Sequence, residues 1–182
     1  MFRLVFSFLF LIIFFFASAQ KYTPVDAGSK VHFIIKNFGI NTGGDFSGLS
    51  GEINFVPANI AASNFNVSVA VNTIDTDNET RDKHLKSTEY FDAEKYPLIT
   101  ITSAKISRTN KSAKGWYYFT GSLTLHGITK AIAFPFSALL KGNDYLFTGE
   151  FIINRLDFGV GKSSSVLSNA VKVSLSVLAK KS

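Results

Sequence analysis

Residues 65–72 read Phe-Asn-Val-Ser-Val-Ala-Val-Asn, and this stretch decides the fold class. Its large apolar side chains occupy every second position, with polar or small residues between them. A period of two is typical of a β-strand that has one face in a core and the other in water. It disfavours parallel strands covered on both faces, because those read as unbroken apolar runs.

The same alternation recurs along most of the chain. It is clearest at residues 31–35, 132–136, 147–153 and 171–177, and further strands are expected at about 51–56, 98–107 and 115–125. Turn-forming residues separate these segments at 42–44, 109–111, 126–127 and 142–144. About eight antiparallel strands follow, and Pro135 inside one of them indicates an edge or a bulge. The strand count leaves a closed barrel and a sandwich open, although closure removes exposed edges.

One short helical insertion interrupts the strands. Asp77 is predicted to cap a helix from about Asn78 to Lys86, with Glu79 in the first turn, where the helix dipole favours a carboxylate. The segment from Asp75 to Glu94 holds seven acidic and three basic residues, a net charge of −4, whereas the whole chain carries +6. The insertion is therefore an acidic segment in a protein whose net charge is positive.

The first nineteen residues have the pattern of a secretory signal. Arg3 precedes an apolar run over residues 4–16, and Ala17-Ser18-Ala19 offers a cleavage site. The run is short of the roughly 20 apolar residues that span a membrane, although an uncleaved anchor is the alternative. We expect cleavage after Ala19, one domain over residues 20–182, and a periplasmic or secreted location. The chain has no cysteine, which excludes disulfides and thiol catalysis.

The densest polar cluster is Arg81-Asp82-Lys83-His84. An acid this close to a histidine suggests general acid–base catalysis, as in a hydrolase or isomerase that uses His84. On a helix, however, Asp82 points away from both Arg81 and His84, so it would not orient the imidazole. We therefore predict no catalytic residues and expect these side chains to cap the helix and tie it to neighbouring strands.

Other site classes find little support. His32, His84 and His126 are far apart in sequence, so no metal site is predicted. Basic residues do not cluster with aromatic ones, which argues against a nucleic-acid partner. The chain is nevertheless rich in phenylalanine. Such residues suit a packed core or a tunnel for a hydrocarbon chain, and composition does not distinguish the two.

Three blocks of sequence resemble the YceI-like family of exported, lipocalin-type, polyisoprenoid-binding proteins. The first block holds Arg81-Asp82-Lys83-His84 and continues through Tyr90-Phe91-Asp92 to Tyr96-Pro97. The second runs from Gly121 to Lys130, and the third from Asn154 to Gly159. One departure is Asn37, because many members carry a histidine there. If that histidine contacts a ligand headgroup, headgroup specificity differs in this chain.

The resemblance implies an all-β fold: a closed, lipocalin-like barrel of about eight antiparallel strands with a lumen for a long-chain isoprenoid or similar amphiphilic lipid. The side chains expected to line the lumen are Phe33, Ile35, Phe46, Phe91 and Phe119. The motif positions that hold the fold or contact a headgroup are Arg81, Asp82, His84, His126, Arg155 and Asp157, with Arg155 and Asp157 bracing each other.

The function that follows is binding, for carriage, storage or sequestration of the lipid, and not catalysis. No cofactor is expected apart from the bound lipid, for example an isoprenoid quinone. The main alternative is a ligand-free barrel that acts as an interaction module. Transient contact with a membrane surface and a homodimer are further expectations that the sequence leaves open.

Overall fold

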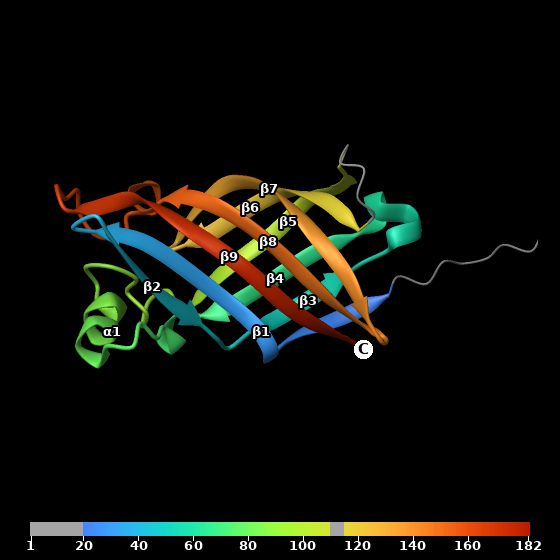
Figure 1. The fold of residues 1–182 in the computed structure, drawn as a ribbon, viewed down its shortest axis with the longest axis horizontal. Coiled ribbons are helices and arrows are strands. Elements are labelled where there is room, and N and C mark those ends of the chain that lie inside the picture. The colour runs from blue at the N-terminus through green and yellow to red at the C-terminus, as the bar shows by residue number, and fades with distance from the viewer. Residues whose placement is uncertain (1–19, 110–114) are drawn as a thin grey trace, which may run out of the picture.

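The computed structural model describes residues 20–109 and 115–182, and its nine strands form one antiparallel sheet (Figure 1). The predicted signal at 1–19 and most of the turn predicted at 109–111 lie outside these residues. The strands are β1 (Lys21–Asn37), β2 (Ile40–Phe46), β3 (Ser50–Asn54), β4 (Asn64–Ala70), β5 (Leu98–Arg108), β6 (Trp116–Leu125), β7 (Ile128–Lys141), β8 (Asp144–Asn154) and β9 (Leu167–Lys181). The helices are α1 (Glu79–Lys86) and the 3-10 turns η1 (Pro57–Ala62), η2 (Val71–Thr73) and η3 (Arg155–Phe158).

Strand β1 closes the sheet into a barrel. On one side it pairs with β9 along most of its length, from Tyr22↔Lys181 to Asn37↔Leu167. On the other side its first residues pair with β3 and its last seven pair with β2. Eight strands thus form a closed antiparallel barrel, with β2 as an additional strand. The predicted all-β barrel is confirmed, and the described residues contain no helix long and apolar enough to cross a membrane.

Strand β2 was not predicted from the sequence, because Thr42-Gly43-Gly44 has the composition of a turn. The two glycines instead lie inside the strand, where the segment after η2 packs closely on it. A Cβ atom on Gly44 would lie 2.6 Å from Thr76 Cγ2 and 2.7 Å from the Asp75 carbonyl oxygen. The glycines therefore permit a close backbone approach. The turn itself falls at Phe38 and Gly39, which both have positive φ.

The helical insertion begins one residue later than predicted. Asn78, not Asp77, is the N-cap, and its side chain accepts a hydrogen bond from the backbone N–H of Arg81 at 2.9 Å. Asp77 has a φ of +57° and donates its own N–H to Asp75 Oδ1. The chain therefore turns sharply at Asp77 before the helix starts, which leaves the capping position to Asn78.

Pro135 lies where one ladder of the barrel ends. Strand β7 pairs with β6 from Ile128 onward, but its pairing with β8 starts only at Phe136↔Gly149. A proline cannot donate a ladder hydrogen bond, so it is placed best at such a boundary. The prediction of an edge at Pro135 is confirmed.

The barrel has two halves of different content. In the half that holds both ends of the described chain, Phe55 is fully buried and contacts the rings of Phe65, Tyr117, Tyr145 and Phe147. The other half lies next to α1, on the left of Figure 1. Its inward side chains are mostly valine, isoleucine and leucine, and they surround a cavity.

Candidate functional site

The cavity has a volume of about 600 Å³ and occupies the α1 half of the barrel. Its walls are inward-facing residues of strands far apart in sequence, among them Val31, Val67, Ile101, Val173 and Val177. These positions alternate with outward residues, as the period of two requires. Because their side chains are short, they do not meet across the barrel, and the lumen stays open.

A stack of three rings bounds the cavity at mid-barrel. Phe151 on β8 lines the cavity and stacks on Phe134 of β7, with ring centroids 4.7 Å apart. Phe134 stacks in turn on Phe119 of β6 at 4.9 Å. Beyond this stack the aromatic cluster around Phe55 fills the lumen.

Four of the five predicted lining residues face the cavity, namely Phe33, Ile35, Phe46 and Phe91. The exception is Phe119, which is 1% exposed and belongs to the packed aromatic cluster. Alternation correctly places Phe119 on the inner face of its strand. Alternation does not show where along the barrel axis the side chain lies. That position determines whether the side chain lines the cavity or belongs to the packed core.

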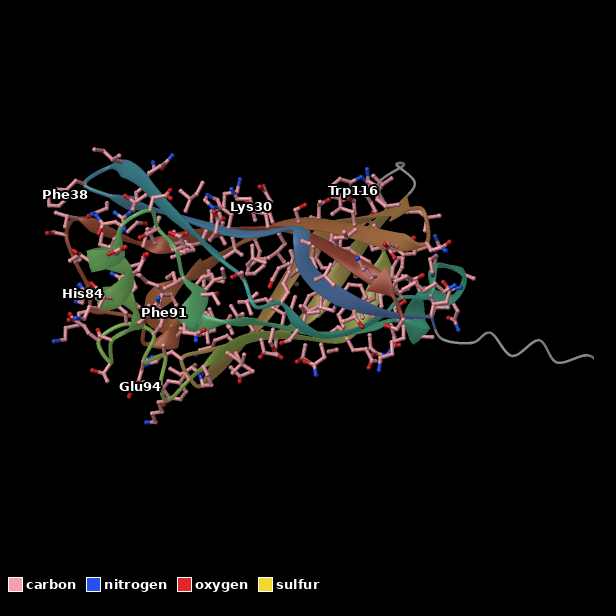
Figure 2. The ribbon with its side chains drawn as sticks, turned by 90° about the horizontal axis from the view of Figure 1, so that it is seen from below. Lys30, Phe38, His84, Phe91, Glu94 and Trp116 are labelled. Carbon is pink, nitrogen blue, oxygen red and sulfur yellow. The ribbon has the colours of Figure 1, made fainter. Side chains whose placement is uncertain are left out.

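The end of α1 and the segment after it line part of the cavity, and Phe91 of this segment is labelled in Figure 2. Leu85, Tyr90 and Phe91 all contribute to the lining. The Phe91 ring meets the Phe46 ring edge-on, with ring centroids 5.8 Å apart. The centroids of the Phe46 and Phe33 rings are 5.6 Å apart. These aromatic contacts connect the insertion to β1 and β2 across the cavity.

Arg81 and Asp82 bind the same residue, the buried Thr76. Arg81 donates from Nε to Thr76 Oγ1 at 2.8 Å and from its terminal nitrogen to the Thr76 carbonyl oxygen. Asp82 Oδ1 accepts the backbone N–H of Thr76 at 3.0 Å and also its hydroxyl. The first turn of α1 is thereby fixed to the segment that packs on β2.

His84 does not pair with Asp82. Its Nε2 lies 3.2 Å from Glu89 Oε2, and its ring meets Tyr90 edge-on at 4.9 Å. The imidazole is exposed at the rim, while the Asp82 carboxylate is bonded to Thr76. Across the described residues, no three His, Asp or Glu side chains are grouped so that they could hold a metal ion.

Arg155 is buried, and none of the residues that the structure describes gives it an acidic partner, so the predicted brace to Asp157 is wrong. The side chain is 3% exposed and donates four hydrogen bonds, to the carbonyl oxygens of Val160, Lys162 and Ser168 and to Asn169 Oδ1. Asp157 is exposed on η3. Burial lowers the pKa of Arg155, partly offset by the nearby Tyr90. Arg155 therefore fixes the loop between η3 and β9, which forms one side of the mouth.

His126 lies outside the cavity lining, at the β6–β7 turn. It has a φ of +51° and is followed by Gly127 at +73°, as the predicted turn requires. Its Nδ1 lies 3.2 Å from the Phe158 carbonyl oxygen, and its ring meets Tyr96 at 4.9 Å. The contacts of His126 join this turn to η3 and to the segment before β5.

Polar residues gather where the cavity opens. Asn37 and Thr42 come from the β1–β2 hairpin, and Lys162, Ser163 and Ser164 come from the η3–β9 loop. Deeper in the barrel the lining is almost entirely apolar. Sequence reasoning missed this loop as part of the site, and the only available signal was its proximity to the third family block. A deep apolar lumen with a polar mouth suits an amphiphilic molecule.

Comparison with known proteins assigns the chain. The model of the YceI-like domain matches residues 22–179. The chain belongs to the YceI-like family. Its relatives include a UPF0312 protein of Pectobacterium carotovorum, 29% identical over 88% of this chain and 85% of that protein. A UPF0312 protein of Vibrio cholerae is 32% identical over 84% of this chain and 85% of its own length.

Solved structures show the same YceI-like barrel. BcnA of Burkholderia cenocepacia superposes with a TM-score of 0.77 at 26% identity, covering 85% of this chain and 98% of that one. A polyisoprenoid binding domain from Saccharophagus degradans superposes with a TM-score of 0.70 over 88% of this chain and 98% of its own. At 17% identity, that second likeness concerns the fold alone.

Proposed function

We propose that this YceI-like protein binds a long-chain isoprenoid or similar amphiphilic lipid in its barrel and carries, stores or sequesters it. The observation that supports the proposal most directly is the apolar cavity of about 600 Å³ inside a closed barrel. Each methylene group that leaves water for such a lumen contributes about 0.8 kcal/mol. A hydrocarbon chain thus gains more from this site than a compact polar ligand does.

The mouth favours an amphiphile over a plain hydrocarbon. Arg81, Glu89 and Lys162 lie at the open end of the lining, together with the hydroxyls of the η3–β9 loop. A polar headgroup could be hydrated and hydrogen-bonded there while its tail fills the lumen. The related Saccharophagus domain, named for polyisoprenoid binding, is consistent with a tail of this class.

The proposal includes export. Residues 1–19 have the pattern of a cleavable signal, so the mature protein would act in the periplasm or outside the cell. Free long-chain lipids are poorly soluble in water, and a barrel that encloses the tail would let such a lipid cross an aqueous compartment.

Native mass spectrometry of the full chain, expressed with its leader in a bacterial host, tests both parts. We expect a polypeptide mass that starts at Gln20, and a one-to-one adduct that organic extraction removes and identifies as a long-chain isoprenoid. A mass without adduct, unchanged after incubation with an isoprenoid quinone, would overturn lipid binding and favour the ligand-free interaction module. A His84→Ala variant that keeps the adduct but loses a hydrolase or isomerase activity would instead support the enzyme alternative.

A further inference from the structure

The tip of the β1–β2 hairpin presents large apolar side chains to solvent. Phe38 is 73% exposed and Ile40 is 70% exposed. Val166, in the η3–β9 loop, is 39% exposed, and its carbonyl oxygen accepts the backbone N–H of Phe38 at 2.9 Å. We call these three residues the apolar tip. Phe38 lies at the same end of the barrel as His84 and Phe91 (Figure 2), and His84, Phe91 and Val166 line the cavity.

The backbone at Phe38 is unfavourable for the residue it carries. Phe38 has a φ of +50° and Gly39 a φ of +76°, and Asn37↔Ile40 closes the hairpin around them. This two-residue turn favours asparagine followed by glycine, whereas a bulky side chain in the left-handed region is an outlier. The strain at Phe38 is not offset by burial of its ring, because the ring is exposed. A contact outside the chain would account for an aromatic residue at this position.

The apolar tip borders the mouth of the cavity. Asn37, directly before Phe38, lines the cavity, and so does Val166 itself. A surface that covered the apolar tip would therefore also cover one side of the opening. Exposed apolar residues elsewhere, such as Leu139 and Leu140 at the other end of β7, do not line the cavity.

Charge divides the mouth into two sides. Residues 27–44 and 158–171, which supply the hairpin tip and the η3–β9 loop, contain no acidic residue. Among the described residues, two of their exposed lysines, Lys36 and Lys162, make no ion pair, whereas the third, Lys30, lies 3.6 Å from Asp45 Oδ2. The acidic insertion around α1 lies on the opposite side (Figure 1). An anionic surface would be attracted to the side with the apolar tip and repelled by the other.

We propose that the apolar tip docks on an anionic phospholipid membrane, with Phe38, Ile40 and Val166 in the headgroup layer and Lys36 and Lys162 against lipid phosphates. Aromatic and aliphatic residues flanked by lysine are the combination that binds reversibly at the membrane interface. Docking would place the mouth against the lipid surface. Its purpose rests on the proposed lipid binding, but its occurrence does not.

Vesicle flotation tests the docking directly. The probes are vesicles of phosphatidylcholine that contain either about 30% phosphatidylglycerol, which is anionic, or none. We expect the protein to float with the anionic vesicles and to remain largely free with the neutral ones. The double variant Phe38→Asn/Ile40→Thr should lower the partition coefficient about tenfold or more, because it removes the two most exposed of the three side chains of the apolar tip.

The double variant also guards against a folding artefact. Asparagine suits the left-handed turn position and threonine suits a strand, so the variant should be at least as stable as the parent. The matched control is Ile152→Thr, since Ile152 on β8 is also 70% exposed but lies on the barrel wall. It should leave partition unchanged.

Several outcomes would overturn docking by the apolar tip. The first is that the double variant and the parent partition equally onto anionic vesicles. The second is that Ile152→Thr lowers partition as much as the double variant does. The third is that light scattering shows the double variant changing from dimer to monomer while its partition onto vesicles is unchanged. The vesicles contain no isoprenoid, so docking is measured separately from cavity binding. If the parent protein keeps its lipid adduct but does not float with the anionic vesicles, docking alone is refuted. If the parent protein floats but carries no adduct, only the proposed lipid binding is refuted.

Discussion

The two halves of the barrel share one sheet and one alternation of side chains, yet one half is packed and the other is hollow. In the packed half, Phe55, Phe65, Phe136 and Phe147 reach across the axis and meet one another. In the hollow half, inward positions hold shorter residues, such as Val69 on β4, the strand that also carries Phe65, and Val173 on β9. Side-chain size at inward positions, and not strand pairing, therefore determines where the lumen opens.

Phenylalanine itself has two roles across that division. Phe55 is surrounded by other rings, while Phe46 faces the cavity and, in the part of the chain that the structure describes, contacts only the rings of Phe33 and Phe91. A packed ring is difficult to remove, because its neighbours cannot collapse into the space that it leaves. A ring beside an existing cavity leaves little new void.

The largest effect should come from breaking the packed half. Phe55→Ala is expected to lower the free energy of unfolding by about 4 kcal/mol, because it opens a void among four aromatic neighbours. Phe46→Ala should lower it by about 1 kcal/mol. Urea unfolding of both variants measures the difference. Equal losses would mean that the cavity is collapsed in solution.

A second change would fill the hollow half. Val173→Phe places a ring in the lumen beside Phe33 and Phe151, which are the cross-strand neighbours of Val173 on β1 and β8. We expect lipid affinity to fall at least about tenfold, or 1.4 kcal/mol, with stability changed by less than about 1 kcal/mol. Ile152→Phe, on the outer face of the neighbouring strand, is the control and should bind as the parent does. Titration with a fluorescent isoprenoid analogue reports the affinity, and unaltered affinity of Val173→Phe would place the ligand elsewhere.

The smallest effect sharpens the contrast through pH. Burial raises the pKa of Tyr22 and of Tyr145, both in the packed half, above the ordinary value of 10.0. As the pH rises, these tyrosines lose their protons in the unfolded state before they do so in the folded state, so the unfolded state is stabilised relative to the folded one. Stability should be independent of these groups below pH 10.0 and fall as the pH rises toward their folded pKa values. Urea midpoints measured from pH 9 to 11 should decline less in Tyr22→Phe; an equal decline would exclude Tyr22 as a source.

Much of the fold follows from residues that alternate in the sequence. The pattern at residues 65–72 predicts β4 and its inner face, and the resemblance adds closure of the barrel. Strand β2 could not be predicted in this way, because Gly44 is set by contacts with Thr76 and Asp75 from a distant segment, and Gly43 by the close approach of Phe33 and His32 on β1. The composition around residues 42–44 does not indicate that another segment packs against them.

The candidate site was predictable in kind but not in extent. Phe33 and Phe46 lie on faces that alternation identifies, and both face the cavity. Phe119 was misplaced because its burial depends on Phe134 and Phe65, which approach it from other strands. The role of Arg155 was missed for a similar reason, since three of its four acceptors are backbone carbonyls, which every sequence has.

The bonding of Arg155 has a consequence for the environments in which the mouth can keep its shape. All four oxygens that hold the guanidinium are neutral, so none of them gains or loses a proton between acid and alkaline conditions. A carboxylate in the same place would release the loop when protonated. This chain is proposed to work outside the cytoplasm, where the cell does not buffer the pH. There, acid would not protonate the groups that hold the η3–β9 loop, so the loop would stay anchored.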